Sequence, residues 1–283
     1  MKGAPLKLTV LCENSVAGPF GLIGEHGWSI LIEMRGRKIL FDTGQGIGIL
    51  NNSMRLGKDL GALDMLVLSH GHYDHASGIP QVAGLNANLK VLCHKDVFLP
   101  RYWVKDGDER FIGMIHRRPF LESLGCRFSF FSEFTEIVPG IYVTGEVPRI
   151  TDFEKPDPHM EIEIEENGKI TRVQDPLMDD LSLVVDTPSG LVVVLGCAHA
   201  GLINILSHVQ KNLPGKKIHT VIGGTHLGFA EDVQFHQTLK ELEAFEIKRL
   251  GASHCTGLSN SARLASRLED RFFNASVGVK LEL

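Results

Sequence analysis

The chain has 283 residues, of which 43% are hydrophobic and 22% charged, with a formal net charge of −5 and a pI near 6.2. This composition is typical of a soluble α/β protein that buries one large core. The negative net charge argues against a protein that coats nucleic acid without sequence preference, although it is compatible with a local basic groove. No apolar run reaches the ~18 residues of a membrane span, and the first residues lack the apolar core of a signal peptide, so we expect a cytoplasmic protein with no membrane contact. Five cysteines without a framework spacing indicate reduced thiols rather than a disulfide scaffold.

The N-terminal part of the chain is rich in strand patterns. Apolar and β-branched residues predict strands at 6–11, 29–34, 38–41 and 63–68, and a short helix at 49–60. The second and third strands flank the turn-forming trio Arg35-Gly36-Arg37, so we expect a hairpin whose second strand delivers Asp42 to a sheet edge. Two interpretations of Asp42 stay open. It is either a helix cap or an acceptor for the N–H of a metal-binding imidazole.

A dense group of potential metal ligands follows the apolar strand that ends at Leu68. His70, His72, Asp74 and His75 place three imidazoles and one carboxylate within six residues, in the spacing H-x-H-x-D-H. Alternate side chains of an extended segment point the same way, so His70 and His72 can share one ion. Asp74 and His75 come around the following turn and more naturally hold a second ion. The spacing therefore predicts a two-metal site rather than a His-rich polar loop.

The middle of the chain alternates between regular and irregular patterns. A helix is predicted to begin near Ala76, and strands are predicted at 89–93, 127–131 and 141–144. Residues 101–118 are charged and aromatic, fit neither helix nor strand, and are interpreted as an inserted flap. A second irregular segment runs over 146–180, and within it residues 162–165 and 169–172 predict a hairpin around Asn167-Gly168.

In the C-terminal part, histidines and a cysteine follow predicted strands. A hairpin of strands 181–186 and 191–195 is followed by Cys197 and His199, a strand at 220–222 by His226, and a strand at 248–252 by His254. Helices are predicted at 202–213, 233–245 and 261–273. Gly223 and Gly224 permit close backbone approach just before His226.

These motifs together resemble one family, the metallo-β-lactamase superfamily. The resemblance is carried by the His70 to His75 run, by Phe41-Asp42-Thr43-Gly44, by Gly196-Cys197-Ala198-His199 and by Ser253-His254-Cys255-Thr256-Gly257, and it extends over nearly the whole chain. The branch that the chain resembles contains dihydropterin-ribofuranosylaminobenzene-phosphate synthases and general metal-dependent hydrolases. The resemblance implies an α/β fold, a four-layer αβ/βα sandwich, formed by residues 1–283 as a single domain with insertions near 101–120 and 146–180.

The resemblance also implies roles for the later histidines. A histidine expected before the 181–195 hairpin is replaced by Met178-Asp179-Asp180, so His199 is expected to complete the first metal's ligands and His254 those of the second. Cys197 aligns with the bridging residue of the family, and a small buried hydrophobe is the other interpretation of this position. The catalytic candidates are Asp74, which would orient the attacking water, and His226, as proton donor or oxyanion contact, with a satisfied structural histidine as the alternative.

The implied activity is that of a dinuclear metal-dependent hydrolase, in which a metal-bound hydroxide attacks an ester-type bond, with a phosphodiester or a phosphorylated small molecule favoured. Zinc is the expected metal, and manganese and iron are alternatives. Other readings are the pterin-linked synthase reaction and lactone or β-lactam hydrolysis. A redox or purely binding role is disfavoured because flavodiiron relatives carry Glu where this chain has His72.

The expected partner is an anionic small molecule, and the sequence does not indicate an oligomeric state. Arg110, Arg117 and Arg118 in the flap lie among Trp103, Phe111 and Phe120, so the flap can offer guanidinium groups for phosphate and flat faces for a ring. The alternative is a solvated charged loop, because acidic residues are also present in it. Arg149 is a further candidate substrate contact.

Overall fold

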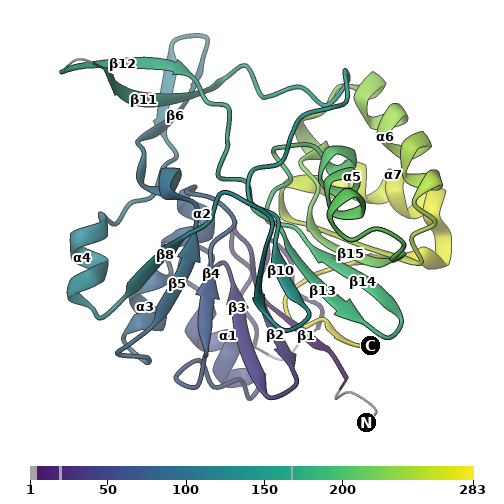
Figure 1. The fold of residues 1–283 in the computed structure, drawn as a ribbon, viewed down its shortest axis with the longest axis horizontal. Coiled ribbons are helices and arrows are strands. Elements are labelled where there is room, and N and C mark those ends of the chain that lie inside the picture. The colour runs from purple at the N-terminus through teal and green to yellow at the C-terminus, as the bar shows by residue number, and fades with distance from the viewer. Residues whose placement is uncertain (1–4, 19–20, 167) are drawn as a thin grey trace.

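The computed structural model describes residues 5–18, 21–166 and 168–283, and two seven-stranded sheets lie at its centre (Figure 1). The first sheet has the order β18-β1-β2-β3-β4-β5-β8. Its strands β1 to β3 and β18 are antiparallel, whereas β3, β4, β5 and β8 run parallel. The strands are β1 Lys7–Cys12, β2 Ser29–Met34, β3 Arg37–Phe41, β4 Met65–Val67, β5 Lys90–Cys93, β8 Arg127–Phe130 and β18 Lys280–Glu282.

The second sheet has the order β17-β16-β15-β14-β13-β10-β9, and β14 to β17 within it are parallel. Its strands are β9 Thr135–Val138, β10 Ile141–Val143, β13 Leu183–Thr187, β14 Gly190–Val194, β15 Ile218–Gly224, β16 Arg249–Ser253 and β17 Phe272–Asn274. Because the carboxyl ends of parallel strands meet at one edge, the residues that follow β14, β15 and β16 are brought together there.

Helices cover the outer faces of both sheets (Figure 1). The α-helices are α1 Ile49–Arg55, α2 Tyr73–Ala76, α3 Ile79–Ala83, α4 Arg118–Ser123, α5 Leu202–Asn212, α6 Asp232–Ala244 and α7 Leu258–Leu268. The 3-10 helices are η1 Lys95–Phe98, η2 Leu227–Phe229, η3 His254–Thr256 and η4 Glu269–Arg271. Among the described residues, no helix combines the length and the apolar character needed to cross a membrane.

Three apolar clusters fill the spaces between these layers. One joins the facing surfaces of the two sheets, with Ile30 and Val67 from the first and Val185 and Ile222 from the second. Another packs α5, α6 and α7 on the outer face of the second sheet, and a third packs α1 and α3 on the first sheet. Helices, sheet, sheet and helices form the predicted four-layer αβ/βα sandwich.

A third sheet stands apart from the sandwich, at the upper end of the molecule in Figure 1. Its order is β12-β11-β6-β7, with β6 Arg101–Lys105, β7 Asp108–Phe111, β11 Met160–Glu166 and β12 Lys169–Gln174. The predicted hairpin of residues 162–165 and 169–172 is confirmed by β11 and β12, although Asn167 in its turn lies outside the described residues.

The prediction that residues 101–118 are irregular was wrong. Residues 101–111 form the hairpin of β6 and β7, and α4 begins at Arg118. β6 pairs with β7 across the turn at Asp106-Gly107, a local hairpin signal that the sequence prediction did not use. The other neighbour of β6 is β11, which lies more than fifty residues further along the chain and is invisible to a local pattern.

The predicted last helix, 261–273, was also partly wrong. Helix α7 ends at Leu268, and Phe272 and Phe273 belong to β17, which extends the parallel sheet beside β16. Apolar residues such as Phe272 and Phe273 are compatible with an edge strand as well as with the buried face of a helix, so the local pattern does not distinguish the two.

Candidate metal centre and active site

The histidine-rich motif lies where β4 ends. His70 follows the strand after two residues, His72 stands just before α2, and Asp74 and His75 are within the first turn of that short helix. All four side chains are buried, with exposed fractions of 6% or less. Gly71 must be glycine here, because a Cβ atom would overlap the Val97 carbonyl. The motif therefore points into the molecule rather than toward solvent.

The second sheet brings its own donors to the same place. Cys197 and His199 follow β14, His226 follows β15, and His254 follows β16 in η3. A Cβ atom at Gly196 would collide with Ser69 beside the motif, so a glycine before Cys197 lets the two halves touch.

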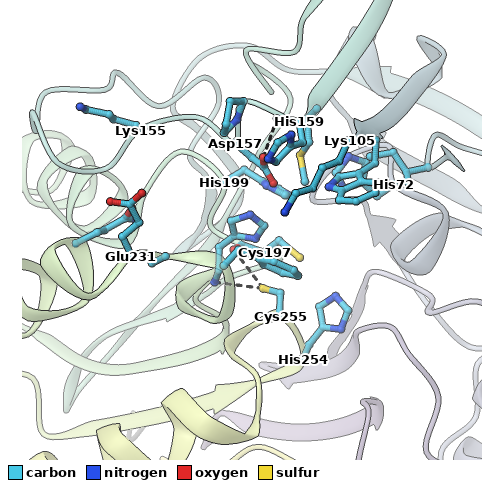
Figure 2. Close-up of a pocket in the computed structure, with 18 of the residues that line it drawn as sticks. His72, Lys105, Lys155, Asp157, His159, Cys197, His199, Glu231, His254 and Cys255 are labelled. Carbon is cyan, nitrogen blue, oxygen red and sulfur yellow. Dashed lines mark hydrogen bonds between the residues drawn. The ribbon is translucent and has the colours of Figure 1, made fainter. Parts of the chain in front are cut away.

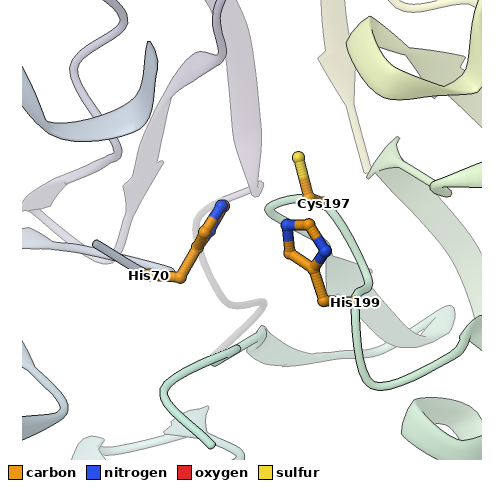
Figure 3. Close-up of side chains that lie close together, drawn as sticks. All are labelled: His70, Cys197 and His199. Carbon is orange, nitrogen blue, oxygen red and sulfur yellow. The ribbon is translucent and has the colours of Figure 1, made fainter. Parts of the chain in front are cut away.

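The donor atoms form two groups that share one sulfur. His70, Cys197 and His199 have ligand atoms within 4.8 Å of one another (Figure 3), and so do His75, Cys197 and His254. His72 joins the first group, because His70 Nε2 lies 3.0 Å from His72 Nδ1. Asp74 joins the second group through a 3.2 Å contact of its Oδ2 with His254 Nε2. The structure thus brings together the six residues that we expected to bind metal, with Cys197 between the groups.

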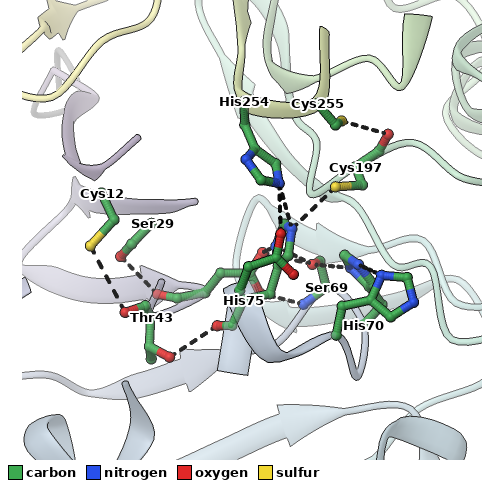
Figure 4. Close-up of polar contacts among 12 residues, drawn as sticks. Cys12, Ser29, Thr43, Ser69, His70, His75, Cys197, His254 and Cys255 are labelled. Carbon is green, nitrogen blue, oxygen red and sulfur yellow. Dashed lines mark hydrogen bonds and ion pairs between the residues drawn. The ribbon is translucent and has the colours of Figure 1, made fainter. Parts of the chain in front are cut away.

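The chemistry of these donors fits divalent cations. His72 Nε2 and His199 Nε2 are buried without a hydrogen-bond partner in the described part of the chain. Nε2 of His75 faces Nε2 of His254 at 3.3 Å and the Cys197 sulfur at 3.1 Å (Figure 4). Unprotonated buried nitrogens whose lone pairs converge are costly, unless a cation binds those lone pairs.

The pKa shifts agree with this arrangement. Burial and the neighbouring imidazoles lower the pKa of His70 and of His199 well below the ordinary value, so both rings are neutral and keep a lone pair for a cation. Burial also raises the pKa of the Cys197 thiol, so this sulfur binds a cation only by releasing its proton.

A carboxylate behind the motif orients two of the rings. Asp42 is fully buried, and its Oδ2 accepts hydrogen bonds from His75 Nδ1 at 2.7 Å and from Ser69 Oγ at 2.6 Å. Ser69 Oγ in turn lies 2.8 Å from His70 Nδ1. With Nδ1 engaged, both rings present Nε2 to the centre. Against the opposing effect of burial, Asp42 raises the pKa of His75.

Sequence reasoning missed the residues that orient His254. Asn14 Oδ1 lies 3.0 Å from His254 Nδ1, and the buried Glu13 accepts from the His254 backbone N–H at 2.7 Å. Asn14 Nδ2 is also 3.4 Å from Nδ1 of His26, whose Nε2 reaches Asp74 Oδ2 at 3.1 Å. These contacts span up to 241 residues of sequence, and no spacing could have revealed them.

A cavity of about 990 Å³ opens beside the donors, and we call the donors that line it, His72, Asp74, Cys197, His199 and His254, its floor. Figure 2 shows His72, Cys197, His199 and His254 at this cavity. This volume suits a drug-sized ligand. The third sheet forms part of the wall through residues such as Trp103, Lys105 and Arg110.

His226 lies at the cavity beside the floor. It adopts a left-handed backbone with φ of 56°, its N–H donates to Cys255 Sγ at 3.2 Å, and its ring centroid is 4.3 Å from that of His199. Neither ring nitrogen has a hydrogen-bond partner among the described residues. One ring nitrogen of His226, which could bind a metal ion, also lies within 4.8 Å of the sulfurs of Cys197 and Cys255. His226 is thus placed to contact either a substrate or a cation.

Three arginines expected near substrate do not line the cavity. Arg117 and Arg118 are exposed at the start of α4, where Arg118 pairs with Glu122 at 2.7 Å. Arg149 instead donates to the carbonyls of His199 and Pro176, and so supports the turn that carries a floor residue. The sequence identifies these residues as cations, but it does not show whether their side chains face the cavity or the solvent.

The mixed sandwich, with a histidine-rich set of candidate metal ligands at one sheet edge, defines the class of α/β protein to which the chain belongs. The model of the metallo-beta-lactamase superfamily matches residues 22–254, and the chain belongs to this superfamily.

Relatives match along almost their whole length. The 7,8-dihydropterin-6-methyl-4-(beta-D-ribofuranosyl)-aminobenzene-5'-phosphate synthase of Methanocaldococcus jannaschii is 28% identical, over 96% of this chain and 95% of the relative. An uncharacterized protein of the same organism is 30% identical, over 91% of this chain and 93% of its own length. The crystal structure of Tm1679, a metal-dependent hydrolase of the beta-lactamase superfamily, is 28% identical, with a TM-score of 0.83 over 98% of this chain and 99% of that one. The fold is that of the superfamily's metal-dependent hydrolases.

Proposed function

We propose that the protein is a metal-dependent hydrolase of an ester-type bond, favouring a phosphodiester or a phosphorylated small molecule. The observation that carries the proposal is the convergence of imidazole, carboxylate and thiol donors on the floor of one large cavity. Because both halves of the chain supply donors to this site, we also propose that residues 1–283 act as a single domain.

Two divalent ions would be held by the two groups of donors. His70, His72 and His199 would hold one, Asp74, His75 and His254 the other, and Cys197 would contribute to both. Nitrogen and sulfur donors favour zinc, with manganese and iron as alternatives. When bound, such ions lower the pKa of a water molecule to about 7 and offset negative charge on reacting oxygens.

The protein's own side chains supply orientation and proton transfer. Asp42 and Asn14 fix the rings of His75 and His254 so that Nε2 of each faces the floor. Asp74 can accept a hydrogen bond from the attacking water, and His226 can donate a proton to the leaving group from the cavity side.

A second candidate is the pterin-linked synthase reaction. It is favoured by the relative of that name, which matches 96% of this chain. The same floor would then stabilise the diphosphate that leaves when a dihydropterin diphosphate reacts with ribofuranosylaminobenzene phosphate.

The deciding experiment compares these chemistries on one preparation of metal-loaded protein. We expect hydrolysis of bis(4-nitrophenyl) phosphate to exceed that of lactone and β-lactam reporters, to disappear on chelation and to return when metal is restored. Product from the pterin and aminobenzene substrates, without hydrolysis of any reporter, would establish the synthase instead. Inactivity toward every substrate in protein with full metal content would contradict both.

A further inference from the structure

The third sheet separates two sets of charged residues onto its two faces. Successive side chains of a strand alternate between faces, and residues directly paired across strands share a face. Trp103 pairs with Arg110, and Lys105 is two residues beyond Trp103, so these three side chains share the face that lines the cavity. Tyr102 and Glu109 belong to the opposite face.

The cation on the opposite face, Arg172, is already neutralised. Arg172 lies over the Tyr102 ring at 3.7 Å and forms ion pairs with Glu109 at 2.7 Å and Glu163 at 3.1 Å. Lys105 and Arg110, on the cavity face, differ from Arg172 in this respect. Neither Lys105 nor Arg110 forms a side-chain hydrogen bond or ion pair with any residue that the structure describes, and the Arg110 guanidinium lies 5.9 Å from the centroid of the Trp103 ring.

The free cations are directed at the cavity. Figure 2 shows the Lys105 side chain extending toward the floor near His199, with Lys155 and Glu231 on the other side of the cavity. The ring of His159 packs 5.9 Å from that of Trp103, and its Nδ1 contacts the Val104 carbonyl at 3.2 Å. Two flat rings and two unpaired cations therefore share one wall.

We propose that this wall binds a phosphate monoester group of the substrate, separate from the bond that reacts. The inference rests on the proposed function, because it names the substrate class of the same site. Arg110 offers a guanidinium fork and Lys105 a compact ammonium, which together match the charge of close to −2 and the several acceptor oxygens of a phosphate monoester. Trp103 and His159 supply flat surfaces for the ring that carries it.

The test measures binding rather than turnover. Phenyl phosphate is titrated into metal-loaded protein while tryptophan fluorescence is recorded. Trp103 and the fully buried Trp28 are the two tryptophans, and the Trp103→Phe variant assigns the signal. We expect Lys105→Met and Arg110→Met each to raise the Kd for phenyl phosphate by about ten- to a hundredfold, the usual size for loss of a charged hydrogen bond.

Two controls isolate the phosphate. Arg172→Met removes a cation from the opposite face of the same sheet and should change the Kd by less than about twofold. Benzyl alcohol, which has the ring without the charge, should bind equally to wild type and to the Lys105 and Arg110 variants. Thermal unfolding establishes whether each variant is folded. If Lys105→Met or Arg110→Met does not fold, Lys105→Gln or Arg110→Gln is measured in its place.

An unchanged Kd for phenyl phosphate in folded Lys105 and Arg110 variants would overturn the inference, and so would an equal loss in the Arg172 variant. Bis(4-nitrophenyl) phosphate hydrolysis by the wild type is measured in parallel. Hydrolysis together with variant-insensitive phosphate binding would refute only the inference. Variant-sensitive binding by a protein that hydrolyses no ester would refute only the proposed hydrolase function.

Discussion

Replacing Asp42 with asparagine tests whether metal binding by His75 depends on the hydrogen-bond acceptor behind its ring, a residue that does not line the cavity. The carboxylate is fully buried and accepts three hydrogen bonds, from the Ser69 backbone N–H at 2.7 Å, from Ser69 Oγ at 2.6 Å and from His75 Nδ1 at 2.7 Å. An amide has the same shape and tolerates the left-handed backbone at φ of 58°, but it has only one acceptor oxygen. One buried donor must therefore face the NH₂ group.

The expected cost follows from that mismatch. An unsatisfied buried donor costs about 1–3 kcal/mol, and breaking a buried charged pair about 3–5 kcal/mol, so the free energy of unfolding of metal-free protein should fall by about 3 kcal/mol. Loss of the acceptor that fixes a ligand imidazole typically costs 10–100-fold in metal affinity. We therefore expect weaker metal binding at the site that contains His75, while the site around His70 and His199 is less affected.

Urea unfolding of metal-free protein and competition with a chromophoric chelator measure the two effects. The control is Asp64→Asn, because Asp64 pairs with Arg37 at 2.7 Å near the surface and should contribute less than about 1 kcal/mol. Metal affinity of Asp42→Asn within about twofold of wild type would refute the reasoning, because the carboxylate would then not be orienting a ligand.

Three further predictions concern the floor and its surroundings. His75→Ala should lower the metal content from about two equivalents to about one by elemental analysis, and an unchanged count would exclude the two-ion arrangement. His226→Ala should lower kcat by ~10²-fold with metal content intact, whereas loss of one equivalent would show that His226 is a ligand. Burial raises the pKa of Asp180 to about 7, so the folded state binds this proton more tightly than the unfolded state, and stability should fall as pH rises from about 4 to about 7. The neutral buried histidines act in the opposite direction over this range, so the Asp180 contribution is read as the difference in unfolding free energy between wild type and Asp180→Asn, measured by urea unfolding of metal-free protein. This difference should change by up to about 4 kcal/mol between pH 4 and pH 7, and identical pH profiles would contradict the assignment.

The sequence predicted the fold well because its strongest signals are local. Apolar strands such as β3 and β4, and the dense run from His70 to His75, are each contained within a few residues. The donors of the second half are scattered, and resemblance to the superfamily rather than spacing indicated Cys197, His199 and His254.

The rest depended on contacts that no local pattern reports. Asn14 and Glu13 reach His254 across more than two hundred residues, and β6 pairs with β11, which lies more than fifty residues further along the chain. Arg101 was read as one more charge in a flap, yet it is 1% exposed and pairs with Asp175 and Asp179 at 2.7 and 2.8 Å. Burial of a charge is decided by such distant partners and is invisible in composition.

Arg101 also joins the wall of the cavity to its floor. It begins β6, and its partner Asp179 accepts a hydrogen bond from the Gly71 N–H, between the two histidines of the motif, at 2.8 Å. Removing one partner of a buried pair costs several kcal/mol, so these ion pairs strongly favour this one arrangement of wall and floor. A phosphate held by Lys105 and Arg110, on the same hairpin, would therefore lie at a fixed separation from the donors below. Binding energy gained at the wall is then available to position the reacting bond over the floor, which is how a remote anchor raises kcat rather than affinity alone.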